Sequence, residues 1–509
     1  MLTASNRRLD QRLLWLLLGL AFTLLLYYYY QGWFLAMQSP FSLGEEGPAL
    51  WAAQVLWGGG NPYDIEHLTV HPWRVVTYPP LYFYCGSWFF KLTGAHLYPL
   101  RALSMAAFVI AQITAYRIFT LSGCSRFARI LGLTTLACFW TVWSFSFKAR
   151  VDLPALCLML LAIEQYLVLA RKPKDDNIFR FPRLIVIATL TTLAVLTKQG
   201  EAVVVPAIAA ALIVGRQWRL SLTFMSLAAF LILSSLSLIN QASGGGFLAH
   251  LRFAAQSHFA WHDLNQHISW LGPDGIILFF ALFAAPIFVV GYFKRREERD
   301  GPYRQHFAAL VLAFVLLLLS AGGALYAMGK HAGSVGEAIV PMFAAAWLMA
   351  LASDYMRRRL LLALFVAFGA GFYVINDLTN SMQVGAGSME MAAERLSQAK
   401  FNKDLVLAED SVVAMELGAV PEFVDMSTFF SVWTENSSQI QEIKLRVSEK
   451  RYGAILINSR DGCLLSPVNY WQPDFIRLLK AKYAPLVDFK DDGRNQDFYL
   501  PRLDNNRPH

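Results

Sequence analysis

The stretch LLWLLLGLAFTLLLYYYYQGWFL (residues 13–35) is followed a few residues later by the polar segment SLGEEG (42–47). The first stretch holds no charged residue, and roughly 20 apolar residues are enough to cross a bilayer as a helix. It is too long for the core of a signal peptide and has no small-residue cleavage site behind it, so we expect a retained anchor. The carboxylates of Glu45 and Glu46 are then held close to the membrane surface.

The composition agrees with a chain that crosses the membrane many times. Of the 509 residues, 56% are hydrophobic and 16% are charged, whereas soluble domains have about 25% charged residues. The mean hydropathy is +0.40 and the formal net charge is +8. The five cysteines have no CxxC or metal-like spacing, which favours buried small hydrophobic residues over ligands. The composition therefore predicts an α-helical polytopic membrane protein.

Ten further apolar runs bring the expected number of transmembrane helices to about eleven. These runs lie at 98–121, 126–146, 152–170, 184–199, 201–215, 220–240, 273–293, 307–329, 338–355 and 360–376.

Short basic loops predict how these helices are oriented, because Lys and Arg are retained on the cytoplasmic side. With eleven helices, every basic cluster falls on the same side as the N-terminus. We therefore expect a cytoplasmic N-terminus and, in a bacterial inner membrane, a periplasmic C-terminus. The clusters are Arg7, Arg8 and Arg12; Arg171, Lys172, Lys174, Arg180 and Arg183; Arg216 and Arg219; Lys294, Arg295, Arg296 and Arg299; and Arg357–Arg359.

The chain is expected to form two domains. Residues 1–376 form the transmembrane domain, and its first outer loop, 36–97, carries two broken apolar stretches, Ala49–Trp57 and Leu81–Leu92. These stretches are rich in aromatic residues, so we expect helices that lie in the membrane interface. Residues 377–509 lose the apolar runs and are expected to be a soluble periplasmic domain.

This C-terminal domain is predicted to have an α/β fold. Leu405–Ala408, Glu422–Asp425 and Ala454–Asn458 have the composition of short strands. Ser438–Ser448 and Pro473–Tyr483 have helical periodicity. Strands alternating with helices favour a small α/β domain.

Under this topology, a set of polar side chains falls at helix ends on the outer side. Charges within hydrocarbon cost about 2.5–3.5 kcal/mol, so such groups are expected to face a polar cavity or one another. The set is Glu45, Glu46, Lys148, Arg150, Asp152, Lys198, Gln199, Glu201, His258, His262, Lys330, His331 and Glu337.

These residue types suit group transfer from a lipid phosphate. A carboxylate acts as a general base on an attacking hydroxyl, and Lys or Arg holds a phosphate and neutralises the charge that develops on it. The alternative is that single charges only anchor helix ends or pair locally, as the i,i+4 neighbours Lys148 and Asp152 would.

Four motifs in order along the chain resemble the integral-membrane glycosyltransferases of the C-type fold, in particular the protein O-mannosyltransferases and the aminoarabinose transferases of lipid A. The first is an acid followed by Gly after the first span, and the second a Gly-rich stretch that leads to Tyr78-Pro79-Pro80-Leu81-Tyr82. The others are Arg150-Val151-Asp152-Leu153-Pro154 and Leu196-Thr197-Lys198-Gln199-Gly200. The resemblance covers about residues 30–355, and many such enzymes also carry an outer α/β tail.

The resemblance implies a polyprenyl-phosphate sugar donor and transfer with inversion. It implies that Glu45 is the catalytic base, that Asp152 is the second acid and that Lys198 lies near the donor phosphate. Because the family uses Asp where this chain has two consecutive glutamates, the base is either Glu45 or Glu46. Additional expected phosphate contacts are Arg150, Lys330 and His331.

A divalent metal is a possible cofactor of such an enzyme, and the sequence offers two candidates for its ligands. The aminoarabinose enzymes carry an acid and a lysine where this chain has Thr77 and Tyr78, which argues against their acceptor and their metal site in this chain. His258 and His262 have a spacing that suits a metal, and the alternative is that they are interfacial or hydrogen-bonded histidines.

The sequence therefore predicts a glycosyltransferase whose partners are a polyprenyl-phosphate sugar, membrane lipid and a lipid, glycan or protein acceptor, with no nucleic acid. A transporter or flippase of lipid-linked sugar is the alternative, but the sequence shows no internal repeat of the transporter kind. The third hypothesis is a non-enzymatic membrane protein whose C-terminal tail binds a partner.

Overall fold

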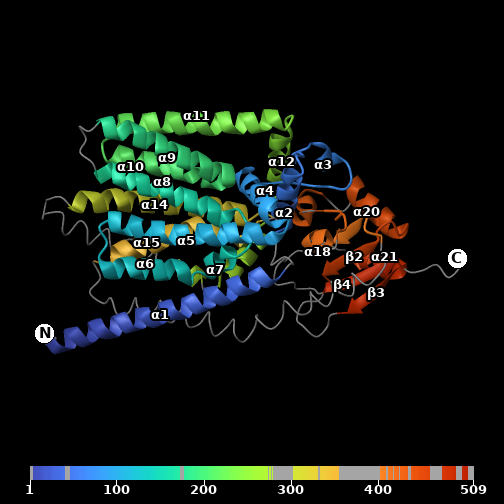
Figure 1. Ribbon diagram of the computed structural model, residues 1–509, viewed down its shortest axis with the longest axis horizontal. Helices are drawn as coiled ribbons and strands as arrows, with labels where there is room; N and C mark the ends of the chain where they lie inside the picture. The colour runs from blue at the N-terminus through green and yellow to red at the C-terminus, as the bar shows by residue number, and fades with distance from the viewer. Residues whose placement is uncertain are drawn as a thin grey trace, which may run out of the picture.

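The protein is a bundle of apolar helices with a small α/β domain at one end (Figure 1). The N-terminal end of α1 and the C-terminal domain lie at opposite ends of the bundle (Figure 1). The computed structural model describes residues 4–39, 46–171, 177–272, 274–276, 278, 302–330, 333–354, 402–408, 411–416, 418–423, 425–433, 437–458, 473–488 and 496–501.

Within these residues, seven helical segments are long and apolar enough to cross a membrane. The short apolar unit formed by η1 (Gln199–Val203) and α10 (Val204–Val214) matches a further expected span. The expected span 360–376, and nearly all of 273–293, lie outside the described residues. The seven segments are in α1 (Ala4–Gln38), α5 (Leu97–Leu121), α8 (Asp152–Arg171), α9 (Asn177–Thr197), α11 (Trp218–Ala242), α14 (Pro302–Met328), and η2 (Val335–Ala338) with α15 (Ile339–Ser353).

The expected span 126–146 is broken into α6 (Arg126–Cys138) and α7 (Trp140–Ser146), which are bent by 71°. Backbone groups freed by a break inside a membrane need partners within the protein. The Asp274 carboxylate accepts hydrogen bonds from the backbone N–H groups of Trp140 and Thr141, at 2.7 and 2.9 Å. The break redirects the chain toward residues 147–151, which precede α8.

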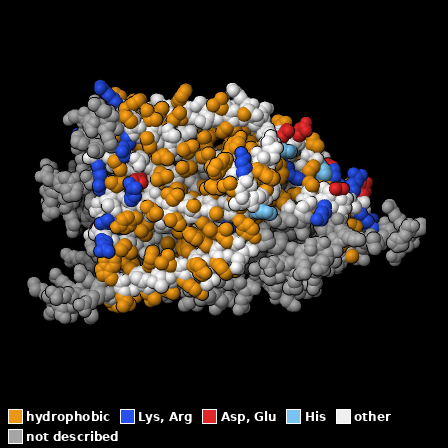
Figure 2. Space-filling model, in the orientation of Figure 1, with side chains coloured by type: hydrophobic (Ala, Val, Ile, Leu, Met, Phe, Trp, Pro, Cys, Tyr) orange, Lys and Arg blue, Asp and Glu red, His pale blue; other side chains and the backbone are white. Residues whose placement is uncertain are grey.

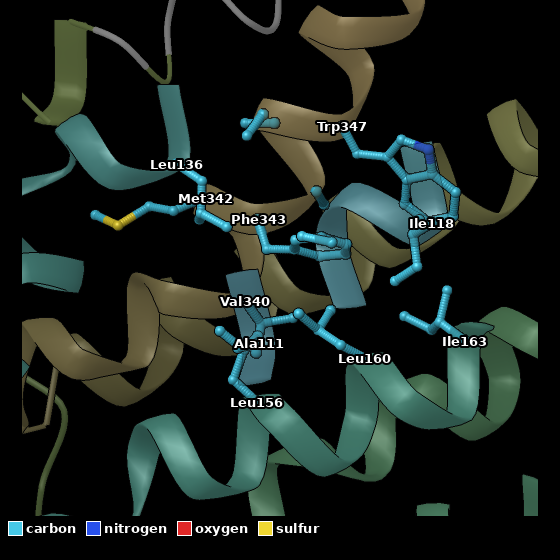
Figure 3. Packing of buried hydrophobic residues seen from close by; sticks show 14 of the residues in the cluster. Ala111, Ile118, Leu136, Leu156, Leu160, Ile163, Val340, Met342, Phe343 and Trp347 are labelled. Carbon is cyan, nitrogen blue, oxygen red and sulfur yellow. The ribbon is translucent and has the colours of Figure 1, made fainter. Parts of the chain in front are cut away.

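The core of the bundle is built around α15, in which every residue is buried. A helix that is apolar all round is expected at the centre of a membrane bundle. Figure 3 shows Phe343 and Trp347 of α15 among side chains of α5 and α8 such as Ile118 and Leu160. The indole N–H of Trp347 donates to the Ser122 hydroxyl at 2.9 Å, which satisfies the one polar atom of this side chain.

The outer surface of the bundle is apolar between its two ends, as Figure 2 shows. α11 lies at the edge (Figure 1) and exposes large side chains, for example Phe230 at 67% and Leu233 at 66%. Basic side chains gather at the end of the bundle where α1 begins (Figure 2). This distribution of apolar and charged groups is what a lipid environment requires.

Short helices cover the other end of the bundle, between the spans and the C-terminal domain (Figure 1). The two stretches expected to be helical, Ala49–Trp57 and Leu81–Leu92, lie within helices, and aromatic side chains of the second are exposed: Tyr84 and Trp88 are 55% and 60% exposed. The short helices are α2 (Gly47–Trp57), α3 (Glu66–Thr69), α4 (Leu81–Thr93) and α12 (Gly246–Ala255).

The C-terminal domain contains a four-stranded sheet of order β1-β2-β4-β3, in which β1 and β2 are parallel and the other pairs antiparallel. Of the expected strand Glu422–Asp425, the described residues 422, 423 and 425 are not part of this sheet. Phe423 and the preceding Pro421 make only isolated bridges, to Trp73 and Val406, and a helix begins at Met426. The elements are β1 (Val406–Ala408), α18 (Ser411–Glu416), α19 (Met426–Val432), α20 (Ser438–Ser448), β2 (Ala454–Asn458), α21 (Pro473–Lys482), β3 (Tyr483–Asp488) and β4 (Gln496–Pro501).

This domain is docked on the loop between α1 and α5 through Trp73 and Arg74. Trp73 is 2% exposed and stacks on Phe423, with ring centroids 5.6 Å apart. The Arg74 guanidinium donates to the Glu422 carbonyl at 2.8 Å, and His71 lies 2.8 Å from the Glu422 carboxylate. The loop that carries Thr77 toward the bundle is therefore fixed by the C-terminal domain.

Candidate functional site

Three of the expected site residues form one cluster at the end of the bundle covered by the short helices. Lys198 Nζ lies 2.8 Å from Asp152 Oδ1, and Arg150 Nε lies 3.0 Å from Asp152 Oδ2. The side chains of all three are less than 10% exposed. The two cations thus contact the two oxygens of one buried carboxylate.

Asp152 and Lys198 lie at helix ends, whereas Arg150 lies in the segment between α7 and α8. Asp152 is the first residue of α8, where a carboxylate is favoured by the positive end of the helix dipole. Lys198 follows the last residue of α9 in an extended conformation, with φ −147° and ψ 119°. The Arg150 guanidinium lies over the ring of Phe145, 4.6 Å from its centroid, an arrangement that stabilises a cation.

The turn before α15 adds a second carboxylate to the cluster. Glu337 Oε1 of η2 lies 3.2 Å from Lys198 Nζ, and the Glu337 side chain is 22% exposed. Ser334, which precedes η2, accepts a hydrogen bond from Arg150 Nη2 at 3.4 Å. Residues from α8, α9 and the start of α15 therefore converge, although they are far apart in the sequence.

Burial and charge shape the titration of the groups around the cluster. Burial by itself lowers the pKa of Lys198, but Asp152 and Glu337 more than offset this, so the pKa is raised and the ammonium stays charged. Burial raises the pKa of the Tyr78 phenol, which stays neutral. Glu201 is 2% exposed, and its Oε2 has no hydrogen-bond partner among the described residues.

Of the two glutamates after the first span, Glu45 lies outside the described residues, whereas Glu46 forms a buried ion pair with Arg101. Arg101 Nε and Nη2 donate to the two Glu46 oxygens at 2.9 and 2.6 Å, and both side chains are 0% exposed. Glu46 Oε1 also accepts from the backbone N–H of Ala149 at 2.6 Å. Glu46 thereby joins α2 and α5 to the segment that leads to Arg150.

The other expected phosphate contacts are not part of the cluster in the described residues. Lys330 Nζ donates to the Ala255 carbonyl at 3.1 Å and lies over the ring of Tyr326, 5.2 Å from its centroid. His331 lies outside the described residues.

The two histidines considered for a metal do not share a helix face. His258 lies before the helical segment that starts at 261, whereas His262 lies in that segment, and both are exposed. No group of three or more His, Cys, Asp or Glu side chains suited to a metal exists among the described residues.

Arg101 is a residue of this region that the sequence analysis did not single out. The signal was an arginine inside the apolar run 98–121, because a charge in such a run requires a partner. A partner is also present for Glu164 of α8, which is 2% exposed and lies 2.7 Å from the exposed guanidinium of Arg117 in α5.

Comparison with known proteins agrees with this fold. A family model described as dolichyl-phosphate-mannose-protein mannosyltransferase matches residues 77–239. That segment includes Tyr78, Arg150, Asp152 and Lys198, but it is less than half of the chain. No curated protein matches the sequence.

Solved structures match over nearly the whole chain. ArnT from Cupriavidus metallidurans bound to undecaprenyl phosphate is 12% identical, with a TM-score of 0.57 over 94% of this chain and 97% of that chain. The Archaeoglobus fulgidus oligosaccharyltransferase tethered with an acceptor peptide is 11% identical, with a TM-score of 0.55 over 94% of this chain and 74% of that chain.

The chain therefore has the C-type fold of integral-membrane glycosyltransferases. The resemblance inferred from the four motifs is confirmed, as is a polytopic helical protein with a small C-terminal α/β region.

Proposed function

We propose that this protein is an inverting glycosyltransferase that moves a sugar from a polyprenyl phosphate to a lipid, glycan or protein acceptor. The observation that carries this proposal is the buried cluster of Asp152, Arg150 and Lys198 at one end of a C-type bundle. The match to ArnT, solved with undecaprenyl phosphate, supports a donor of the same class.

In the proposed reaction, the acceptor hydroxyl oxygen attacks the anomeric carbon of the sugar while the bond from that carbon to the phosphate oxygen breaks. The hydroxyl proton passes to a carboxylate, and the polyprenyl phosphate leaves with the bonding electron pair. Attack opposite to the leaving group inverts the anomeric centre. The protein has to supply a base and to stabilise negative charge on the phosphate.

We assign the base to Glu45. Both oxygens of Glu46 contact Arg101, and Glu46 Oε1 also accepts from Ala149 N–H. Both oxygens of this fully buried carboxylate are occupied by these hydrogen bonds, so they are not presented to an acceptor hydroxyl. Glu46 then serves to position Glu45 and the segment before Arg150.

Lys198 and Arg150 are the proposed phosphate contacts, and Asp152 orients them. An ammonium and a guanidinium offer several N–H donors between them, and Asp152 accepts one from each. Their low exposure strengthens their effect on the leaving phosphate, since charges act more strongly where water is excluded.

We place the reaction on the periplasmic face of a bacterial inner membrane. Basic side chains gather at the end of the bundle opposite the C-terminal domain (Figure 2), which supports a cytoplasmic position for that end. Lys330 and His331 stay candidates for donor contacts. His258 and His262 stay candidate metal ligands as separate side chains, not as a pair on one helix face.

The test uses purified protein in lipid nanodiscs with a panel of radiolabelled polyprenyl-phosphate sugars. We expect sugar transfer by the wild type, and loss of transfer in Glu45→Gln and Asp152→Asn with the fold intact. Undiminished sugar transfer in both variants would refute Glu45 as the base and Asp152 as the residue that orients the two cations. Movement of the lipid-linked sugar across vesicle membranes without sugar transfer would support the flippase alternative. Binding of a protein partner without any need for the sugar donor would support a non-enzymatic binding protein.

A further inference from the structure

We propose that Glu337 is a displaceable counter-ion, which holds the Lys198 ammonium until the donor phosphate takes its place. This inference rests on the proposed function and adds a residue that controls donor affinity. Its basis is that two carboxylates share one buried ammonium and differ in how firmly they are held.

Asp152 is the fixed partner of Lys198. Its two oxygens contact two different cations, Lys198 at 2.8 Å and Arg150 at 3.0 Å, and its side chain is 1% exposed. Its position at the first residue of α8 adds the favourable helix dipole. Displacing Asp152 would leave two buried cations without their carboxylate.

Glu337 is the weaker partner. Its contact with Lys198 is longer, 3.2 Å, and its side chain is 22% exposed. Among the described residues, the ion pair of Glu337 is with Lys198 alone, whereas Asp152 pairs with two cations. Since a partly exposed carboxylate can regain water, removing it from Lys198 costs less than removing Asp152.

The charges of the cluster make this exchange favourable when an anion binds. Arg150 and Lys198 are matched by Asp152 and Glu337, so these four groups sum to zero. A donor phosphate next to Lys198 adds negative charge to a buried site, where like charges repel strongly. Rotation of the Glu337 side chain toward water removes the excess negative charge from the site. It also frees an N–H group of the Lys198 ammonium to bind the phosphate.

The backbone of η2 is seated firmly, so the side chain is the part that moves. A Cβ on Gly336 would lie 2.9 Å from Asp152 Oδ1 and still closer to the Phe145 ring. The Ser334 hydroxyl accepts from Arg150 and also from the Gly336 N–H, at 3.4 and 3.3 Å. Glu337 is thus presented from a fixed turn, and a change of rotamer is enough to release Lys198.

The experiment measures the binding of undecaprenyl phosphate to the full-length protein in nanodiscs, for the wild type, Glu337→Gln and Glu337→Ala. We expect both variants to bind this lipid about tenfold more tightly, which corresponds to about 1.4 kcal/mol. Glu66→Gln removes an exposed carboxylate of the first outer loop and is the matched control, with wild-type affinity expected. In a Lys198→Met background, Glu337→Gln is expected to change nothing.

Unchanged or weaker binding in both Glu337 variants, with the wild type binding the lipid, overturns the counter-ion role and leaves the proposed function standing. The same tightening in the Lys198→Met background also overturns it, because the effect would not pass through Lys198. A wild type that neither binds the lipid nor transfers sugar refutes the proposed function itself. A purely structural role for Glu337 predicts a lower melting temperature and weaker binding, which is the opposite of the expected result.

Discussion

Replacing Glu46 with Gln is expected to damage stability more than chemistry. The substitution keeps the shape of the side chain but leaves the Arg101 guanidinium, which is 0% exposed, without its counter-charge. Breaking a buried ion pair by removing one partner costs about 3–5 kcal/mol. Since proteins are typically stable by about 5–15 kcal/mol, this is a large part of the total. The new amide N–H₂ also faces a group that only donates hydrogen bonds.

The assay is thermal inactivation in detergent, followed by the fraction of protein that stays monodisperse on size-exclusion chromatography. We expect a clearly lower transition for Glu46→Gln, and wild-type behaviour for the exposed control Glu66→Gln. Arg101→Met should give a loss of similar size, because it leaves the Glu46 carboxylate buried without a cation. A Glu46→Gln protein that melts with the wild type but transfers no sugar would refute the structural role and return Glu46 as the base.

Three other predictions test separate parts of the structure. Lys198→Met should lower sugar transfer by about 10²–10³-fold, as loss of one charge-stabilising donor does in other enzymes, whereas the exposed Lys91→Met should not. Burial lowers the pKa of His250 to about 4, so its stabilising effect should be complete above pH 6.5 and be lost as the pH falls toward 4; this loss should be smaller in His250→Gln when melting is followed against pH. Trp73→Ala should cost about 3–5 kcal/mol and should speed proteolysis of the C-terminal domain, whereas the half-exposed Trp57→Ala should leave it protected.

The His250 prediction follows from its two hydrogen-bond partners. Nδ1 accepts from the Val76 backbone N–H at 3.1 Å, and Nε2 donates to the Asp64 carbonyl at 3.0 Å. A second proton on the ring would have to sit on Nδ1, where it meets the Val76 N–H. An unchanged melting temperature between pH 7 and 4 would contradict this arrangement.

The long spans could be predicted from the sequence because hydrocarbon imposes a length and a composition on each helix. The cluster of Asp152 with Lys198 could also be predicted, since both residues lie at helix ends that the basic loops place on the same side. The break between α6 and α7 could not be predicted from the sequence, because the backbone groups at the break are bound by Asp274, a residue more than a hundred positions away. Similarly, the segment Glu422–Asp425 has strand-like composition, but contacts with Trp73 and Arg74 decide its conformation.

The choice between Glu45 and Glu46 likewise depends on contacts with residues distant in the sequence. Adjacent identical residues differ only in what surrounds them, and Arg101 joins Glu46 from the next span along the chain. Only the packing of α5 against the first loop distinguishes the two.

The complete burial of α15 has a consequence for how the protein is made. A helix with no lipid-facing side gains little from staying alone in the bilayer, and its stability comes from a groove between other helices. Among the described residues, the helices that line this groove are α5, α6, α8 and α14, and all four precede α15 in the chain. During synthesis the helices that form this groove are thus already in the membrane when α15 leaves the ribosome. A chain truncated after α14 would expose the groove to lipid and to quality-control proteases.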